Sequence, residues 1–203
     1  LTIDWDIIRA SIRLDHPLPQ RLSSETRQLR IALEEEPSQI LATAELGEFH
    51  ARRHDGNLQM AGLLREALAS EAAGITLPAL DARFAATLKN GEEIILANSS
   101  NLRGTEWLLD ELVISQSGST AQIAASGPLS IDDDGRVNGL LEISVRDVEQ
   151  ILTFVADNSP ELARQIDGVR PLILGLAQKP MELRINKGRM MLGFIPLGEI
   201  PPL

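Results

Sequence analysis

The sequence contains no cysteine and few aromatic side chains. Without cysteine the chain has no disulfide, no thiolate metal ligand and no thiol nucleophile, which is compatible with either the cytoplasm or a cell envelope. The aromatic residues are Trp5, Trp107 and four phenylalanines. Leucine, isoleucine, valine and alanine must therefore form the core, and stacking platforms for bases or sugars are not expected.

Long apolar runs and an excess of positive charge are also missing. No window of about 18 apolar residues occurs, so no segment is expected to cross a membrane as a helix. The formal net charge of −10 argues against binding to nucleic acid or to an anionic membrane surface unless the chain carries a local basic patch. The only short basic cluster in the sequence is Arg52-Arg53, and the other arginines are scattered.

The chain begins at Leu1 without an initiator methionine and already inside an alternating pattern. We therefore expect an N-terminal signal or anchor upstream. Apolar residues occupy odd positions up to Ile7 and then even positions from Ile8 to Leu14. Because a slip of one residue sends side chains to the opposite face, the pattern predicts either a bulge near Ile7-Ile8 or a strand buried on both faces. The prolines of "HPLPQ" end the run.

Alternation with a period of two returns in three further stretches, 40–46, 58–60 and 80–88, and predicts amphipathic strands there. The segment 63–73, "LLREALASEAA", has helix-favouring residues between neighbours that favour strands. Helix and strand both remain open for it.

The central block predicts an antiparallel meander. Short alternating stretches between residues 112 and 145 are separated by Ser117-Gly118, Gly127-Pro128 and Asp134-Gly135. Strands at a spacing of 8 to 12 residues with such turns are typical of hairpins in series.

At Asp147 the period changes to that of an amphipathic helix, and Asp147 with Gln150 resembles a capping box. Ser159-Pro160 predicts the start of a second short helix, and Pro171 the start of a third. Alternation from Met181 to Ile185, the turn "NKG" and a return from Arg189 to Phe194 predict closing strands before the extended end "IPLGEIPPL".

We predict one domain, 1–203, that is α+β and mainly β. Residues 1–145 are expected to be mainly strands, 147–177 helical, and 180–194 the closing strands. The expected architecture is a curved antiparallel sheet with two or three short helices near the C-terminal end packed on it.

The triplet Asp132 to Asp134 followed by Gly135 is the most visible candidate for a metal site. A calcium loop needs oxygen ligands at alternate positions, but the third such position is Arg136, a cation, and the glycine is displaced. We interpret the triplet as a solvated hairpin corner in which Asp134-Gly135 makes a tight turn.

Other polar clusters also have ordinary structural interpretations. His50 and His54 have a helical metal-ligand spacing, but Arg52-Arg53 lies between them and the pair is expected at a strand end. Glu34 to Glu36 and Glu92-Glu93 are interpreted as solvated turns, and "SQSGS" as a hairpin corner. No nucleophile elbow, phosphate loop or dinucleotide motif occurs. We therefore predict no catalytic, metal or cofactor residue and no cofactor.

Small and aliphatic residues remain as the most informative feature of the predicted sheet. Such a sheet either packs against helices or lines a groove for an acyl chain, and Trp5 and Trp107 belong either to the core or to a ligand wall. The alanines that carry this hypothesis are Ala42, Ala44, Ala82, Ala86, Ala121 and Ala125.

The hairpin "ASGPLSIDDDGRVNGLLEISV", the helix after it and the ending "GRMMLG…IPLGEIPPL" resemble a family of alphaproteobacterial envelope proteins classified as a domain of unknown function. The resemblance covers residues 105–203 well and earlier residues loosely. It implies a periplasmic body, an inner-membrane anchor and no catalytic residues. The hairpin is also similar to a phrase in AsmA-like proteins, whose curved apolar sheets are associated with lipid movement.

Together these observations predict a non-enzymatic periplasmic envelope protein that binds lipid or another apolar ligand, or supports envelope assembly. The alternatives are a structural or protein-interaction module of the envelope and, from another class, an envelope-polymer hydrolase. The expected partners are a lipid or apolar ligand, an envelope protein and the membrane through an anchor, but not nucleic acid.

Overall fold

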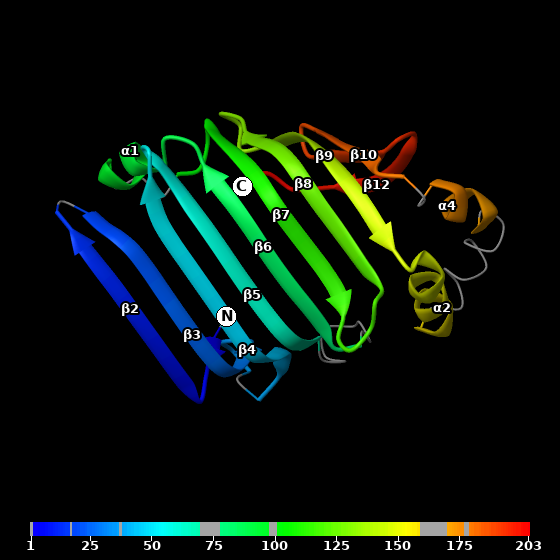
Figure 1. The fold of residues 1–203 in the computed structure, drawn as a ribbon, viewed down its shortest axis with the longest axis horizontal. Helices are drawn as coiled ribbons and strands as arrows, with labels where there is room; N and C mark the ends of the chain where they lie inside the picture. Colours follow the sequence, from blue (N-terminus) through cyan, green and yellow to red (C-terminus); the bar gives the residue numbers. More distant parts are fainter. Residues whose placement is uncertain are drawn as a thin grey trace.

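A computed structural model describes residues 2–16, 18–36, 38–69, 78–97, 101–158, 170–176 and 179–203. Its main feature is one antiparallel sheet of twelve strands in the order β1-β3-β4-β5-β6-β7-β8-β9-β10-β11-β12, with β2 also paired to β3. Nearly every strand pairs with its neighbour in sequence (Figure 1). The predicted mainly β, antiparallel fold class is confirmed.

The strands vary from short edge pieces to strands of 15 residues. Their bounds are β1 Thr2–Asp4, β2 Ile7–Asp15, β3 Leu18–Ala32, β4 Ile40–His54, β5 Asn57–Ala69, β6 Leu80–Leu88, β7 Thr105–Gln116, β8 Gln122–Ile131, β9 Val137–Arg146, β10 Met181–Asn186, β11 Arg189–Leu192 and β12 Ile195–Glu199.

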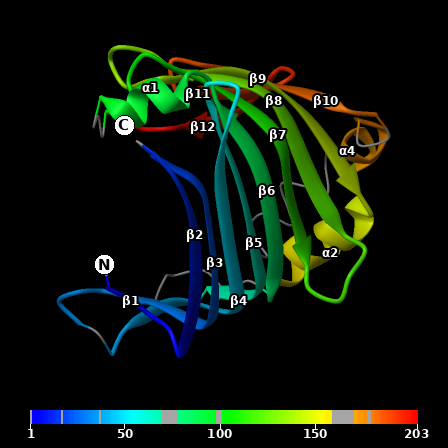
Figure 2. The same ribbon diagram turned by 60° about the vertical axis from the view of Figure 1, so that its left-hand side comes forward.

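The sheet curves into an open half-pipe, which Figure 2 shows nearly along its axis. Helix α1 (Gly91–Leu96) lies inside the curve at one end, and β11 and β12 turn inward at the same end. Helices α2 (Val148–Asn158) and α4 (Arg170–Leu176) lie beyond β9 at one side (Figures 1 and 2). The two predicted helices from Val148 and Pro171 are present, whereas α1 was not predicted.

The phase slip near Ile7-Ile8 marks a change of strand. β1 ends at Asp4, β2 begins at Ile7, and both pair with β3 at different places along its length. The break between the two strands takes the place of the bulge expected near Ile7-Ile8. The alternative of a strand buried on both faces is wrong, because every residue of β2 is exposed. The ambiguous segment is a strand up to Ala69 at the end of β5, and residues 70–73 lie outside the described part.

Gly127-Pro128 lies inside β8 rather than in a turn. The register shifts between Leu109 and Leu112 of β7, whose partners on β8 are Gly127 and Ala125. Gly127 has φ +141°, and a Cβ atom there would overlap the carbonyl oxygen of Leu140 on β9. The glycine and proline therefore accommodate a bulge within two adjoining strands, whereas a sequence pattern alone reads them as a turn.

The capping box predicted at Asp147 is absent. Asp147 has φ +52°, and its carbonyl oxygen accepts a hydrogen bond from the backbone N–H of Gln150 at 3.0 Å. The Gln150 side chain accepts a hydrogen bond from Ser119 Oγ at 2.6 Å. The prediction placed the start of α2 correctly. The side chain of Gln150, however, bonds to Ser119 in the β7–β8 turn instead of capping the helix. The helix expected from Ser159-Pro160 lies outside the described residues.

The C-terminal residues are fixed against the rim of the sheet. The N–H of Leu203 donates to the carbonyl of Gly135, and the N–H of Ile200 to that of Gly188, both at 2.9 Å. In the strands joined by the turns that hold this segment, Ile131, Leu141 and Ile185 are 7%, 7% and 6% exposed. The end of the half-pipe at which β11 and β12 turn inward, called the closed end below, therefore contains much of the small core.

The backbone approach at Gly127 gives a test of the fold. We expect Gly127→Ala to lower the free energy of unfolding by more than about 2 kcal/mol, because it combines a strained φ with an overlap against Leu140. Gly118→Ala is the control: Gly118 also has a positive φ, but nothing lies within 4 Å of its added Cβ, so the expected loss is about 1 kcal/mol. Urea unfolding measures both, and equal losses would contradict the close approach.

Candidate ligand groove

The strand register places three uninterrupted rows of uncharged side chains on one face of the sheet. Directly paired residues of antiparallel strands share a face, as do residues two apart along a strand. The rows are Ile12, Leu22, Ala51, Met60, Ala86, Leu109 and Gly127; Ala10, Ser24, Phe49, Gly62, Phe84, Leu112, Ala125, Ile143 and Met181; and Ile8, Thr26, Gly47, Leu64, Ala82, Ile114, Ile123 and Val145.

These rows, hereafter the groove rows, line the concave face. Ile12, Phe49 and Met60 share a pocket with Ile95 of α1, and α1 lies inside the curve (Figure 2). The longest row crosses every strand from β2 to β10, which at the usual strand spacing is about 38 Å along the curve. The groove rows thus form an uncharged and mainly apolar surface from the β2 edge across most of the sheet.

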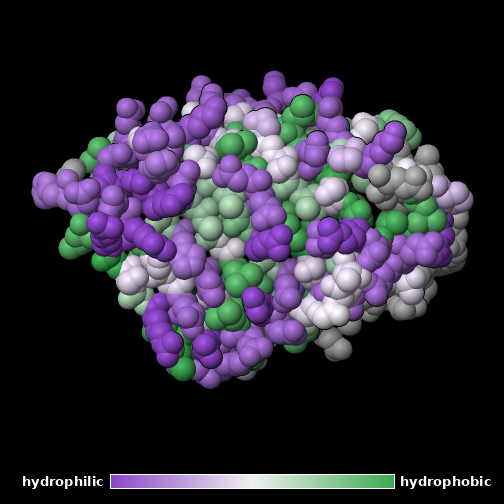
Figure 3. All heavy atoms as spheres, in the orientation of Figure 1, coloured by the Kyte–Doolittle hydropathy of each residue, from purple (hydrophilic) through white to green (hydrophobic). Residues whose placement is uncertain are grey.

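The convex face alternates with the groove rows and is charged. Its rows contain arginines, glutamates and histidine; examples from neighbouring strands are Arg9, Arg13, Glu25, Glu48, His50, Arg83 and Glu111. Arg83 donates two hydrogen bonds of 3.0 Å to Glu111, and the bonds from this guanidinium lower the pKa of the Glu111 carboxyl. Figure 3 shows this face as largely hydrophilic, with separate apolar spots.

Large apolar side chains of the concave face are open to solvent. Ile114, Ile123 and Leu64 are 39%, 41% and 37% exposed, and Ile8 on β2 is 49% exposed. The chain exposes 13106 Å², about 40% more than the roughly 9,300 Å² expected of a compact monomer of its mass. A face on which several large apolar side chains are exposed side by side is characteristic of a binding face.

A deeper pocket lies at the α1 end of the groove. It has a volume of about 330 Å³, and its apolar lining includes Ile12, Leu22, Phe49, Met60 and Ile95. Gly62 shapes the neighbouring wall, because a Cβ atom there would overlap the ring of Phe84. The volume is within the range of small-molecule sites, so this end of the groove can enclose part of an apolar ligand.

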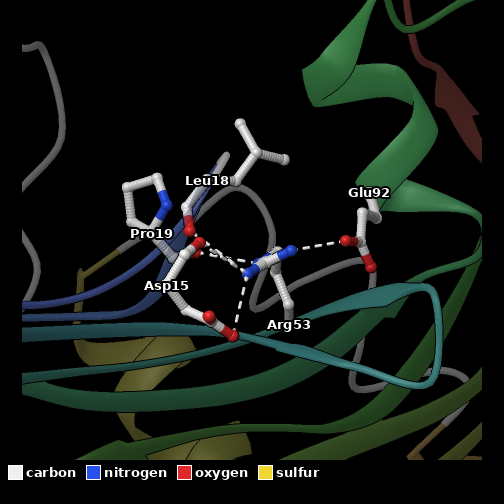
Figure 4. A network of polar contacts seen from close by, with 5 residues as sticks. All are labelled: Asp15, Leu18, Pro19, Arg53 and Glu92. Carbon is white, nitrogen blue, oxygen red and sulfur yellow. Dashed lines mark hydrogen bonds and ion pairs between the residues drawn. The ribbon is translucent and has the colours of Figure 1, made fainter.

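Arg53 holds this end of the groove together (Figure 4). Its guanidinium donates to the carbonyls of Asp15, Leu18 and Pro19 at 3.2, 3.1 and 3.0 Å and forms an ion pair with Glu92 of α1. The Arg53 side chain is 12% exposed. One cation therefore joins the β2–β3 turn to α1. The interpretation of Glu92-Glu93 as a solvated turn was wrong, since both residues lie in the first turn of α1.

The acidic triplet is the corner of the β8–β9 hairpin, and the carboxylate of Asp132 accepts hydrogen bonds within that corner. Asp132 Oδ1 accepts hydrogen bonds from the backbone N–H groups of Arg136 and Asp134 at 2.8 and 3.1 Å, and Oδ2 accepts one from Asn138 at 3.3 Å. The backbone bond from Arg136 is the main cause of a lowered pKa at Asp132. The turn at Asp134-Gly135 is present as predicted, and of the two residues Gly135 alone has a positive φ, of 80°. Left-handed conformations at both positions, which a tight turn of the Asp-Gly type would require, are therefore not found.

The two histidines of the sequence pattern lie on a strand, not on a helix. Four residues along β4 separate His50 from His54 by about 13 Å, which is too far for one metal ion. His50 Nε2 lies 3.5 Å from Glu48, and His54 Nε2 lies 3.4 Å from Asp55. Among the residues that the structure describes, no group of three or more histidine, aspartate or glutamate side chains is placed to hold a metal.

The small residues of the sequence hypothesis divide between groove and core. Ala82, Ala86 and Ala125 lie in the groove rows, although Ala125 is buried at 8% exposure, and Ala44 and Ala121 are buried at 5% and 4% exposure. Trp107 faces the concave side opposite Leu88 and Leu129, and its Nε1 donates to Thr105 Oγ1 at 2.9 Å. Trp5, between β1 and β2, is 44% exposed, so it is not the buried core residue that was considered.

No helix in the described ranges is both long and apolar enough to cross a membrane.

The family that matches the chain, over residues 1–201, is described as uncharacterized proteins conserved in bacteria (DUF2125). No curated protein and no solved structure matches the chain. The match confirms the predicted domain of unknown function and extends it to residues before 105, where the sequence resemblance was loose.

The hydrogen bonds of Asp132 give a prediction about pH. A folded-state pKa below the unfolded value of about 3.9 means that the carboxylate stabilises the fold above that pH and that this contribution is lost as the pH falls through the folded pKa. We expect Asp132→Ala to lower the melting temperature at pH 7 and to differ less from the unmodified chain near pH 2.

The control is Asp133→Ala, because Asp133 is exposed and accepts no hydrogen bond in the described structure. It should change the melting temperature little at either pH. A deficit of Asp132→Ala that is the same at pH 7 and pH 2 would contradict the role assigned to the carboxylate.

Proposed function

For this chain, which belongs to the bacterial family of uncharacterized proteins DUF2125, we propose the binding of a lipid or another long apolar molecule in the concave groove. The single observation that carries the proposal is the set of three uncharged groove rows along an open sheet, in which several large apolar side chains remain exposed to solvent. Each methylene that such a face removes from water contributes about 0.8 kcal/mol. An acyl chain is the common biological group that presents many methylenes in a line.

The groove rows offer little for catalysis. Their only polar side chains are Ser24 and Thr26, and Thr26 Oγ1 already donates to the carbonyl of Gly47 at 3.1 Å. An envelope-polymer hydrolase would need at least two polar groups within reach of one another and of a substrate. A binding role without a reaction at the groove therefore fits these residues best.

A second candidate function, docking of a partner protein, is favoured by the β2 edge. β2 pairs with β3 on one side and with no described strand on the other, and it has nine exposed residues. Exposed edges accept added strands. Co-purification of one stoichiometric protein with no bound lipid would favour this function over the first.

The proposed compartment is the periplasm, with an anchor to the inner membrane. Support comes from the resemblance to envelope proteins and from the match between the groove and molecules that membranes supply. Fractionation of cells that express the complete gene product, tagged at its C-terminus, tests this part. Recovery in the cytoplasmic fraction would overturn it.

We expect gently purified protein to carry lipid detectable by native mass spectrometry and, after delipidation, to bind a monomeric fluorescent fatty acid. The double variant Ile114→Asp/Ile123→Asp should weaken binding of this fatty acid at least tenfold, because two charges would have to be buried against its chain. Both positions are already partly exposed, at 39% and 41%, but they pair directly across β7 and β8, so a melting curve must show that the two opposed charges have not unfolded the sheet.

The matched control is Leu108→Asp/Leu140→Asp. These leucines are similarly exposed, at 41% and 44%, but lie on the convex face, because their pairing partners Thr87 and Arg184 alternate with groove residues. This variant should bind the fatty acid as the unmodified chain does. Equal losses in the two double variants, or no binding by the unmodified chain, would overturn the proposed function.

A further inference from the structure

The fold gathers arginines that are scattered in the sequence into one row. Arg13 of β2 pairs directly with Arg21 of β3, and Arg21 pairs with Arg52 of β4. All three side chains are exposed and lie on the convex face, beside the groove row that begins at Ile12. This row is called the arginine row below.

The arginine row is not neutralised by the described part of the protein. None of its members has an ion pair there, and Arg52 donates only to Gln59 Oε1, at 2.8 Å. Asp110 supplies the carboxylate among the residues that line the depression shared by Arg21 and Arg52, and it accepts a hydrogen bond from Thr87 at 2.9 Å. Like charges directly opposite one another destabilise a sheet. A bound anion would therefore reduce the electrostatic repulsion within the arginine row.

Exposed aliphatic side chains lie at the same end of the sheet. Leu14, at the end of β2, is 79% exposed, and Leu96 and Ile95 of α1 are 53% and 39% exposed. Arg53 joins the two elements that carry them, through the carbonyl of Asp15 and the carboxylate of Glu92 (Figure 4). Protein surfaces that bind membrane interfaces typically combine cationic side chains with adjacent exposed aliphatic side chains.

From this arrangement we propose that the arginine row and the aliphatic residues Leu14, Ile95 and Leu96 form a rim that docks on an anionic phospholipid surface. The arginines bind phosphate groups, which guanidinium recognises well, while the aliphatic side chains enter the interface. Ile12 and Ile95 line the pocket at this end of the groove, so an acyl chain leaving the bilayer meets the groove at the docked rim. The inference rests on the proposed function because it assigns the end at which that ligand enters.

The net charge of −10 does not oppose this docking at physiological salt. The Debye length is about 8 Å there, so carboxylates elsewhere on the sheet are largely screened from the bilayer and the local row dominates. The choice of a lipid surface over an acidic protein follows from Leu14 and Leu96, which an acidic partner held by ion pairs would leave exposed.

The test is flotation of the delipidated 203-residue chain with vesicles of phosphatidylglycerol and phosphatidylethanolamine, and with vesicles of phosphatidylcholine alone. We expect binding to the anionic vesicles only, weakened by salt, and a loss of at least tenfold in Arg13→Glu/Arg21→Glu/Arg52→Glu. The control Arg65→Glu/Arg146→Glu/Arg189→Glu changes the net charge equally at exposed arginines outside the row and should bind as the unmodified chain does.

The neutral variant Arg13→Gln/Arg21→Gln/Arg52→Gln removes the positive charge of the row without adding negative charge, and it should also bind the anionic vesicles more weakly. A melting curve of this variant shows whether the fold is retained. Any of three results would contradict the proposed docking rim. They are equally strong binding to phosphatidylcholine and to anionic vesicles, equal losses of binding in the row and control variants, and capture of an acidic protein without vesicle binding.

Binding of the monomeric fatty acid without vesicles is measured in parallel and should be unchanged in the row variant. If fatty-acid binding fails while row-dependent flotation persists, the groove is wrong and the anionic docking surface stands. If the reverse holds, the groove stands and the rim is wrong.

Discussion

The register between neighbouring strands is the constraint on which the rest of this structure depends. Side chains alternate across a strand with a period of two, so a slip of one residue anywhere in the ladder would mix charged side chains into the apolar face. The irregularities in the sheet do not do this. Between Leu109 and Leu112 the register shifts, yet both leucines stay on the concave face because the intervening pair absorbs the extra residue. The separation of the two faces is maintained across nine strands by this pairing.

An open sheet of this kind has a limited core. Among the described residues no large side chain is fully buried, and the buried ones are mostly alanines and single aliphatic residues such as Leu88, Val113 and Leu152. Much apolar area therefore stays in water, and a ligand that covers it in the folded state alone would add to stability by mass action. Backbone pairing, the Arg53 network and the closed end of the half-pipe hold the curve in the absence of such a ligand.

Arg52 and Arg53 illustrate how a sheet divides one sequence feature into two. As adjacent residues on β4 they point to opposite faces. Arg53 faces inward, is nearly covered, and is paired with Glu92 and three carbonyls. Arg52 faces outward and stands beside Arg21 without a carboxylate partner in the described structure. The dipeptide that looked like the only basic cluster thus supplies one structural cation and one member of a surface row.

Local pattern alone determined much of this protein: the strands near 40–46, 80–88 and 137–145, the start of α2, and the Asp132 corner all follow from alternation, helical period and turn chemistry. It missed β3, whose groove positions Ser24 and Thr26 blur the alternation, and it misplaced Gly127-Pro128, whose role depends on Leu140 of another strand. Only the tertiary structure decided that the apolar face is left open and that Arg13, Arg21 and Arg52 are neighbours. Strand adjacency and the coverage of a face depend on residues far apart in the chain, and no local window contains them.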